Sequence, residues 1–426
     1  MYNLKINYGM KNSSDRLIVI NIFIYLFFLT ICNLGVTEDI QEEKSPIKIG
    51  GAMRVNYAYG SYGDDDNPHR RSQKFGDVDL EVFRLNSDFD YHNIISRIEY
   101  RWYDTYSFIH TAWLGYELSE IGTIKAGIVR TPFGPTDYGV STSWFFDQHF
   151  YVGLADDPDL GVTWNTSVNN LNLDLGYFYG SEFQTDGNSL SSSRYGYDIV
   201  KWEEKADENG TIEWGAGENG YDERHKLNLR SIYSVDNIGD FGLSVQYGML
   251  IGTEVGEDDS GNYYALSGHM KNTFYKFTLF SQFSYYTHNI TDDTPWGTGD
   301  LIPMGAYDFA WPIASTGMIP ALSLRYTGID PSTISWVDSV TPYIEWSSVL
   351  KTVEEYNNST LITLGASWTL FSNLYVYSDI GITDGNFFVG NTADDYNNIL
   401  TGVNHVGANG NNSWHWRLNF NIGYYF

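Results

Sequence analysis

The sequence predicts an all-β protein that forms one closed, antiparallel β-barrel of about sixteen strands. Three observations predict this fold class. Apolar residues alternate with polar or small residues along most of the chain, aromatic residues make up 17% of it, and short turns alternate with long polar connections. A single barrel also accommodates 426 residues, because closed barrels routinely exceed the usual length of one domain.

The composition excludes several classes of protein. The 53 acidic residues exceed the 25 Lys and Arg residues and give a formal net charge of −28, which would repel the phosphates of nucleic acid. Cys32 is the one cysteine, so a disulfide scaffold is excluded. The charged fraction of 18% is low for a surface covered by water, where about 25% is usual. We therefore expect no nucleic-acid partner and a surface that partly faces lipid.

The first 36 residues have the features of an export signal. Lys5, Lys11 and Arg16 precede an apolar run over residues 17–31, which is the arrangement of a secretory signal peptide. We expect cleavage near residues 35–37. The expected organisation is a signal peptide (1–36), a short N-terminal segment (37–46) and a transmembrane barrel (47–426). An uncleaved helical anchor is the alternative, because no Ala-x-Ala motif follows the apolar run.

The alternation has the period of two that is typical of β-strands. Many segments are about 10 to 13 residues long, which exceeds the usual strand of a soluble sheet and matches the 9 to 11 residues of a tilted membrane-crossing strand. After residue 40 no apolar stretch is long enough to cross a bilayer as a helix. The expected strands begin at Ile47, Asp77, Asn93, Ser107, Ile121, Asp159, Leu171, Arg224, Gly239, Gly261, Thr273, Ile319, Ser339, Ser359, Asn373 and Ser413.

The connections between these strands alternate in length. Short turns such as residues 169–170 and 371–373 alternate with long polar connections. Outer-membrane barrels have short periplasmic turns and long extracellular loops, so this alternation predicts the outer membrane of a Gram-negative cell, with lipid and lipopolysaccharide around the barrel. Aromatic pairs at strand ends, such as Trp102 with Tyr103 and Tyr285 with Tyr286, are expected to form interfacial girdles. The expected long connections are 60–75, 131–158, 181–222, 288–318 and 384–412.

The last segment carries the clearest single signal. From Trp414 to Phe426 the apolar and aromatic residues occupy even positions, and polar residues or glycine occupy most of the odd ones. A terminal Phe on an outward-facing strand resembles the assembly signal of bacterial outer-membrane proteins. With the export signal, it predicts an outer-membrane location.

One segment resembles a known family. Residues 122–134, GTIKAGIVRTPFG, are similar to the strand-to-loop signature of the phosphate-selective porin O and P family, in which a glycine-led strand ends in a basic residue, a spacer and Pro-Phe-Gly. Arg130 and Gly134 fall on that pattern, and strands around Arg54 and Arg84 fit the family's plan. The resemblance implies a sixteen-stranded, homotrimeric porin that passes small hydrophilic or charged solutes, with anions such as phosphate among them.

The expected lumen wall is richer in basic residues than the chain as a whole. Selectivity would come from the channel radius, an inward-folded loop and the pattern of charges on the wall. Arg97, Glu99 and Arg101 share one face and form either a charge ladder or ion pairs that neutralise buried charge. The candidates for the constriction loop 131–158 are Asp137, Asp147 and His149. The candidates for the pore lining are Arg54, Arg97, Glu99, Arg101, Arg130, Lys226, Arg230, Arg325 and Arg417.

Other functions are less well supported by the residues. The nine histidines are scattered over different segments without a metal-binding or nucleophile motif, so we expect no enzyme, no metal site and no cofactor. An oligosaccharide-preferring porin is the first alternative, because Tyr and Trp rings stack on sugars. An adhesive or structural barrel without transport is the second. The connection 288–318 contains Trp296, Trp311 and several prolines, and we expect it to be ordered and to enter the lumen or cap a neighbouring subunit.

Overall fold

The computed structural model describes residues 45–61, 75–187, 193–206, 212–252, 260–291, 294–331, 334–354, 356, 358–385 and 414–426. The expected signal peptide, most of the short N-terminal segment, and most of the connections 60–75 and 384–412 lie outside these residues. Residues Pro46–Phe426 form one compact unit, which contains the barrel.

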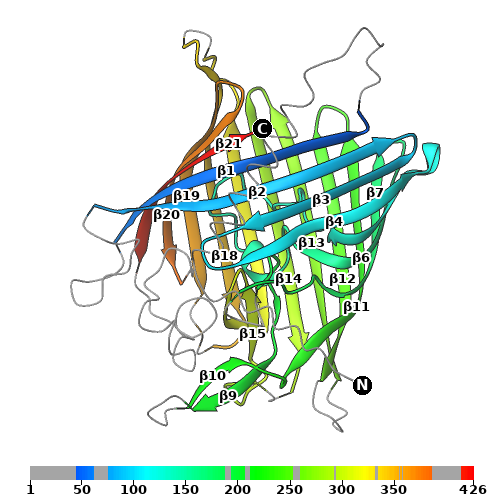
Figure 1. Ribbon diagram of the computed structural model, residues 1–426, viewed down its shortest axis with the longest axis vertical. Coiled ribbons are helices and arrows are strands. Elements are labelled where there is room, and N and C mark those ends of the chain that lie inside the picture. The colour runs from blue at the N-terminus through cyan, green and yellow to red at the C-terminus, as the bar shows by residue number, and fades with distance from the viewer. Residues whose placement is uncertain are drawn as a thin grey trace, which may run out of the picture. The chain divides into compact units, whose positions relative to one another are not determined.

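Sixteen strands form a closed antiparallel barrel, which confirms the predicted fold class (Figure 1). Each strand pairs with its neighbours along the chain, and β21 pairs with β1. All sixteen strands begin within four residues of the positions expected from the sequence. The strands are β1 (Ile47–Gly60), β2 (Asp77–Tyr91), β3 (Ile94–Trp102), β4 (Ser107–Glu117), β5 (Thr123–Arg130), β6 (Pro158–Val168), β7 (Leu171–Ser181), β11 (Tyr221–Val235), β12 (Gly239–Gly252), β13 (Ser260–Phe274), β14 (Phe277–Asn289), β17 (Thr316–Tyr326), β18 (Val337–Lys351), β19 (Ser359–Leu370), β20 (Leu374–Asp384) and β21 (His415–Tyr425).

The two faces of the barrel wall have opposite polarity. On β12 the side chains of Leu243, Val245 and Tyr247 are exposed, whereas those of Ser244 and Gln246 between them are buried in the interior. An apolar outer face and a polar inner face are the pattern of a barrel that stands in lipid. No helix within the described ranges is both long and apolar enough to span a bilayer.

The barrel closes at a glycine. The backbone N–H of Gly51 donates to the carbonyl of Phe426 at 2.9 Å, and the N–H of Phe426 donates back at 3.1 Å. A Cβ on Gly51 would lie 2.6 Å from Cζ of the Phe426 ring, so only glycine lets the terminal aromatic lie against β1. The last strand therefore seals the barrel with both its backbone and its final side chain.

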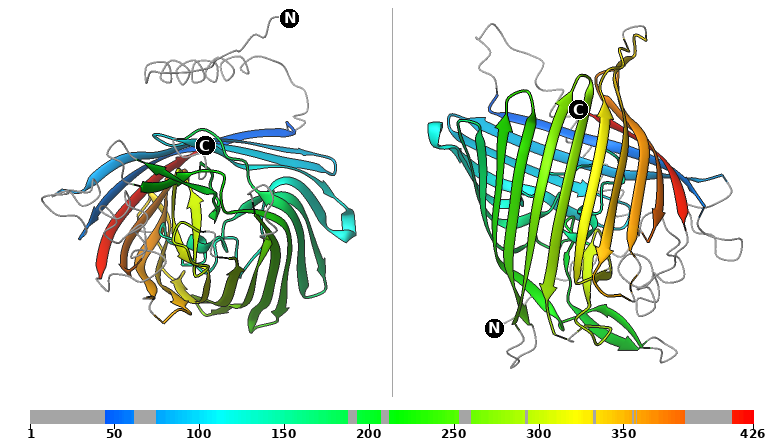
Figure 2. Two further views of the ribbon diagram at one scale, coloured as in Figure 1. Left: turned by 90° about the horizontal axis from the view of Figure 1, so that it is seen from below. Right: turned by 180° about the vertical axis from the view of Figure 1, so that it is seen from behind.

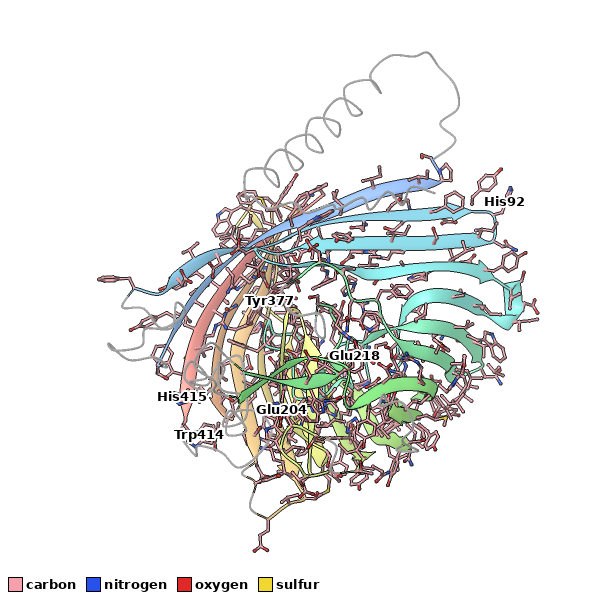
Figure 3. All side chains as sticks on the ribbon, turned by 60° about the horizontal axis from the view of Figure 1, so that its bottom comes forward. His92, Glu204, Glu218, Tyr377, Trp414 and His415 are labelled. Atoms are coloured by element: carbon pink, nitrogen blue, oxygen red, sulfur yellow. The ribbon has the colours of Figure 1, made fainter. Side chains whose placement is uncertain are left out.

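The shortest turns lie at one end of the barrel and the longest connections at the other. The connections β2–β3, β6–β7, β11–β12 and β13–β14 span two or three residues, and they all lie at the end opposite the connections 131–157, 182–220 and 290–315. His92 lies in one short turn, whereas Glu204 and Glu218 lie in a long connection (Figure 3). The predicted asymmetry of the connections is confirmed.

The described residues of the long connections contain five further strands. β8 (Asp198–Ile199), β15 (Leu301–Ala306) and β16 (Phe309–Ala314) form a three-stranded sheet, and β9 (Trp202–Ala206) pairs with β10 (Ile212–Ala216). Two 3-10 helices, η2 (Ser119–Ile121) and η3 (Phe150–Val152), lie in the connections that flank β5. The sequence analysis predicted these connections to be loops without strands. It missed the five strands because they are short and pair with one another and not with the barrel wall.

Three connections fold into the barrel, where their backbone lies inside the strands in Figure 2, and their aromatic side chains share one core. Phe150 of the first connection packs on Tyr197 of the second, with ring centroids 4.8 Å apart, and Tyr197 packs on Trp311 of the third, also at 4.8 Å. The core continues onto inward-facing residues of the wall such as Tyr263 and Leu361. Of the two positions expected for residues 288–318, the lumen is where the described residues of this connection pack.

The expected aromatic girdle is wrong in part. Tyr286 is 2% exposed and points inward, where its hydroxyl donates to the carbonyl of Ala314 at 3.0 Å. Tyr103 also packs on the interior core, with its ring 4.9 Å from that of Tyr106. Consecutive residues of a strand point to opposite faces, so both members of an adjacent aromatic pair cannot face the lipid.

Candidate pore constriction

The connection 131–157 crosses the interior of the barrel from β5 to the opposite wall. Its two ends meet where the N–H of Thr131 donates to the carbonyl of Asp157 at 2.7 Å. Its middle reaches β18, where Ser141 Oγ and the N–H of Thr142 donate to Glu345 at 2.5 and 2.6 Å. We call residues 131–157 the crossing loop. A loop held in this way narrows the barrel interior.

Further contacts fasten the crossing loop around the wall. The N–H of Trp144 donates to Asp379 of β20 at 2.9 Å, and its indole N–H donates to Glu81 of β2 at 3.0 Å. Arg325 of β17 donates to the carbonyl of Val140 at 2.7 Å. Because these strands are spread around the barrel, the loop lies across the lumen rather than along one side of it.

Asp147 and His149 hold the crossing loop together. One Asp147 oxygen accepts the backbone N–H of His149 and contacts its Nδ1, both at 2.8 Å, and the other accepts the N–H of Val140 at 2.7 Å. The His149 Nε2 atom lies 2.8 Å from Ser284 Oγ on β14. Both side chains are at most 2% exposed, so these two constriction candidates stabilise the loop from within and do not line a solvent-filled channel.

Asp137 faces the solvent side of the same loop. Its side chain is 45% exposed and lies 3.8 Å from Arg130 and 3.6 Å from Arg230. Arg130 also pairs with Asp156 and donates to the hydroxyl of Tyr138 at 3.2 Å. The negative charge of Asp156, together with burial, raises the pKa of Tyr138, so this phenol stays protonated near neutral pH. The base of the loop is thus a mixed patch of cations and acids.

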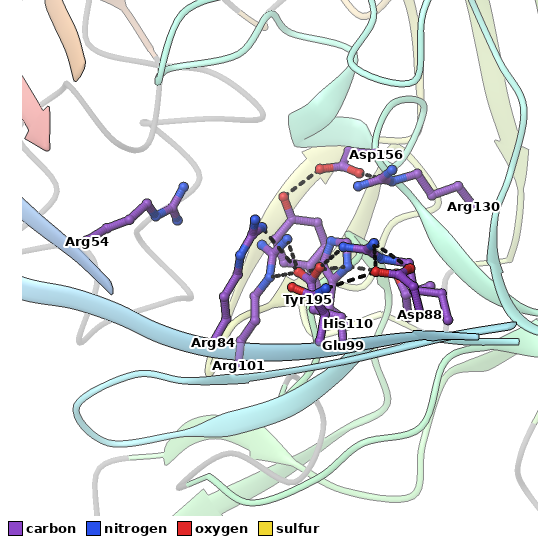
Figure 4. Close-up of polar contacts among 12 residues, drawn as sticks. Arg54, Arg84, Asp88, Glu99, Arg101, His110, Arg130, Asp156 and Tyr195 are labelled. Atoms are coloured by element: carbon purple, nitrogen blue, oxygen red, sulfur yellow. Dashed lines mark hydrogen bonds and ion pairs between the residues drawn. The ribbon is translucent and has the colours of Figure 1, made fainter. Parts of the chain in front are cut away.

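A cluster of arginines lies on the wall formed by β2 and β3 (Figure 4). Glu99 accepts bonds from Arg84 at 3.4 Å, from Arg97 at 2.8 Å and from Arg101 at 2.7 Å. Arg97 also binds Asp88 at 2.8 Å. Three guanidinium groups therefore share two carboxylates and leave formal positive charge on this wall. Of the two interpretations of Arg97, Glu99 and Arg101, the structure favours ion pairs.

Arg84 belongs to this cluster, although sequence reasoning did not place it on the lumen wall. It lies directly opposite Arg101 in the register of β2 and β3, and its Cζ lies 5.1 Å from the Tyr425 ring. The register of β1 on β2 shifts between Arg54 and Val55. The alternation of odd and even positions therefore no longer identifies the lumen-facing residues near this point. Only the cross-strand register with the predicted lumen residue Arg101 would have identified it.

The pore-lining candidates point to the interior, but four of the nine are buried. Arg417 is 0% exposed because the crossing loop covers it, with the Trp144 ring 4.7 Å from its Cζ. Lys226 is buried between Asp157 and Asp159. Glu99 and Arg101 are buried in the cluster on β3. Their burial places these four candidates within the packed interior. The partly exposed candidates are Arg54, Arg97, Arg130, Arg230 and Arg325.

The fold has counterparts among solved structures. In-vitro folded OmpT, an outer membrane protein of Vibrio cholerae in its trimer form, is 12% identical and aligns with a TM-score of 0.55 over 89% of this chain and 99% of that one. The anion-selective porin from Comamonas acidovorans is 10% identical and aligns with a TM-score of 0.54 over 90% and 100%. The barrel has the fold of outer-membrane porins.

A third structure with the porin fold is the outer membrane channel DcaP of Acinetobacter baumannii, which is 11% identical and aligns with a TM-score of 0.53 over 92% of this chain and 100% of that one. No protein-family model matches the sequence, and a search of curated proteins finds no match. At these identities the likeness establishes the porin fold, and the function has to be argued from the residues of the barrel interior.

Proposed function

We propose that the chain is an outer-membrane porin that passes small hydrophilic solutes passively, with a preference for anions. The observation that carries this proposal is the cationic lumen wall. Partly exposed arginines of β1, β2 and β3 line the barrel interior beside the crossing loop, and their carboxylate partners neutralise only part of their charge. Charged side chains at a constriction set the sign of ion selectivity.

The preference for anions has two further supports, the exposure of two of these arginines and one structural neighbour. Arg54 contacts Glu81 at 3.2 Å and keeps a side chain that is 20% exposed, and Arg97 is 32% exposed. One structural neighbour is described as an anion-selective porin. A preference for phosphate among anions rests on the resemblance of residues 122–134 to the phosphate-selective family, and it is the narrower part of the proposal.

The two alternatives predict different interiors. A sugar channel needs exposed aromatic rings along its path. Tyr195, Tyr197 and Trp311 of the aromatic core are each at most 3% exposed, so these rings pack on one another and are not free to stack on a sugar. An adhesive barrel needs loops that extend outward, whereas three long connections here pack inside. The anion channel is therefore the better-supported function.

The remaining parts of the proposal concern location and assembly. We expect export through the N-terminal signal peptide, insertion in the outer membrane beside lipopolysaccharide, and a homotrimer. The apolar outer face supports insertion in lipid, and one structural neighbour is described in a trimer form. No catalysis and no cofactor are part of this function. Chemical cross-linking of the purified protein in detergent tests the trimer directly.

The test of the transport function is electrical recording from the purified protein in a planar lipid bilayer. We expect stepwise increases in conductance, and a reversal potential under a KCl gradient that has the sign of an anion-selective channel. Added phosphate should reduce the chloride current if phosphate is preferred. Cation selectivity would contradict the anion proposal, and protein that inserts without conductance would favour the adhesive barrel.

A further inference from the structure

We propose that Asp157, Asp159 and Asp198 form a binding site for one calcium ion inside the barrel. The site goes beyond the proposed transport function, because cation binding is a separate property of the point where the interior loops meet the wall. Asp157 ends the crossing loop, Asp159 lies at the start of β6, and Asp198 belongs to β8 in the connection 182–220. Two segments that are separate in the sequence, residues 157–159 and β8, thus converge on one point.

The spacing of the three carboxylates fits one ion. Each residue offers one oxygen, and these oxygens all lie within 4.8 Å of one another. Calcium binds oxygen at about 2.3–2.6 Å, so ligands on opposite sides of it are roughly 4.6–5.2 Å apart. All three side chains are at most 3% exposed. Solvated surface acids do not have this burial, because isolated buried carboxylates are costly.

Two further carboxylates adjoin the three aspartates. Glu182 is 3% exposed and accepts the backbone N–H groups of Tyr195 and Gly196 at 3.0 and 2.6 Å. Glu223 of β11 is also buried and accepts hydrogen bonds from the N–H of Ile199 and the hydroxyl of Tyr263, both at 3.3 Å. The interior here is therefore crowded with acidic groups.

The cations at this point do not balance the acids. Lys226 Nζ lies 2.9 Å from Asp157 and also pairs with Asp159, and Arg194 lies 3.3 Å from Asp198. Five carboxylates thus face two cationic side chains. The acids at this point therefore outnumber the cations by three. A divalent cation would remove most of that excess.

Three carboxylate oxygens at this point accept no hydrogen bond from any part of the chain that the structure describes: Asp157 Oδ1, Asp159 Oδ1 and Glu182 Oε2, all of them buried. Two of these atoms surround Gly196. A Cβ there would lie 2.9 Å from Asp157 Oδ1 and 3.3 Å from Glu182 Oε2. Both atoms thus border a space that a side chain at position 196 would fill.

The donor set selects the kind of cation. Every group in it is a carboxylate oxygen, without histidine or cysteine, and such sets suit hard cations and not zinc or copper. Calcium tolerates irregular geometry and six to eight oxygens, whereas magnesium requires near-ideal octahedral geometry at about 2.0–2.1 Å. Bound calcium would tie the end of the crossing loop to β8 and so hold two inward-folded connections in place.

The test is calorimetric titration of the folded, EDTA-treated protein with calcium chloride, with magnesium chloride as competitor. We expect one calcium ion per chain in the wild type and about tenfold or greater loss of affinity in Asp198→Asn. Asp137→Asn is the matched control, since Asp137 lies in the same loop but is exposed. The barrel fold of each variant is checked by its heat-dependent mobility in gel electrophoresis.

Absence of calcium binding to the wild type would overturn the proposal, and the acids would then be neutralised by protons. Equal binding by the wild type and folded Asp198→Asn would also overturn it, because the ion would then sit on surface loops or lipopolysaccharide. Should Asp198→Asn fail to fold, Glu182→Gln gives the second comparison. Channel recordings without calcium test the transport function separately, so the two proposals fail independently.

Discussion

Replacing Glu345 by alanine should free the middle of the crossing loop from the wall. Glu345 is 3% exposed and accepts two hydrogen bonds from the loop, from Ser141 Oγ and from the N–H of Thr142. A hydrogen bond to a charged group contributes about 1.5–3 kcal/mol, so the loop loses about 3–6 kcal/mol of attachment. The contacts of Trp144 and Val140 with the wall remain, so we expect a segment that opens more often, within a loop that stays inside.

Single-channel recording measures this change. Glu345→Ala should show a higher mean conductance and larger current fluctuations than the wild type, because the loop obstructs the interior less. Ser323→Ala is the matched control. Ser323 Oγ on β17 donates to the same carboxylate at 3.0 Å, so this variant loses a bond within the wall and keeps both bonds to the loop. Folded Glu345→Ala with wild-type conductance and noise would refute the claim that this loop narrows the path.

Three further variants test separate parts of the structure. Arg97→Gln should lower anion preference, seen as a smaller reversal potential under a KCl gradient, whereas Lys276→Gln in a short turn should leave it unchanged. Gly51→Val should lower the temperature at which the barrel unfolds on gels, by an overpacking cost of about 1–3 kcal/mol, because its Cβ meets the Phe426 ring. Gly268→Val is the control, since its nearest neighbour would be 4.0 Å away. Trp311→Ala should remove about 3–5 kcal/mol from the aromatic core and make the inner connections sensitive to protease; unchanged resistance would mean that the core does not hold them.

The barrel wall could be predicted from the sequence because strand alternation is a local property. Each strand places apolar residues on its outer face, whatever the rest of the chain does. The last strand illustrates this, since Phe420, Ile422 and Tyr424 are exposed on the outer face while Arg417 and Asn419 are buried inside. The alternation also predicted the first residue of each strand to within four residues, because a turn or a long connection interrupts it at the end of every strand.

Which inward-facing side chains are buried could not be predicted in the same way. Parity correctly assigned Arg417 and Lys226 to the inner face, but burial depends on which loop lies over each residue. Arg417 is covered by Trp144, which is more than 270 residues earlier in the chain. The same holds for Asp147 and His149, whose role in stabilising the loop depends on Ser284 and on the path of the whole loop.

The acidic cluster was missed for a related reason. Asp157 and Asp159 are close in sequence, but Asp198 and Glu223 join them only through the folding of a second connection and the pairing of β11 with β7. Spacing motifs identify metal sites when the ligands lie on one helix, strand or loop. Ligands gathered from a loop, the start of one wall strand and a small inner strand leave no such pattern.

The most direct test of the interior arrangement is modification of a single cysteine at Arg97 while current is recorded. Cys32, the one natural cysteine, falls in the expected signal peptide, so Arg97→Cys would carry one thiol in the exported chain. Leu114→Cys, on the outer face of β4 and 61% exposed, is the matched control. We expect a bulky water-soluble thiol reagent to reduce the current through Arg97→Cys and to leave that through Leu114→Cys unchanged. An unchanged current through fully labelled Arg97→Cys would contradict an ion path along this wall.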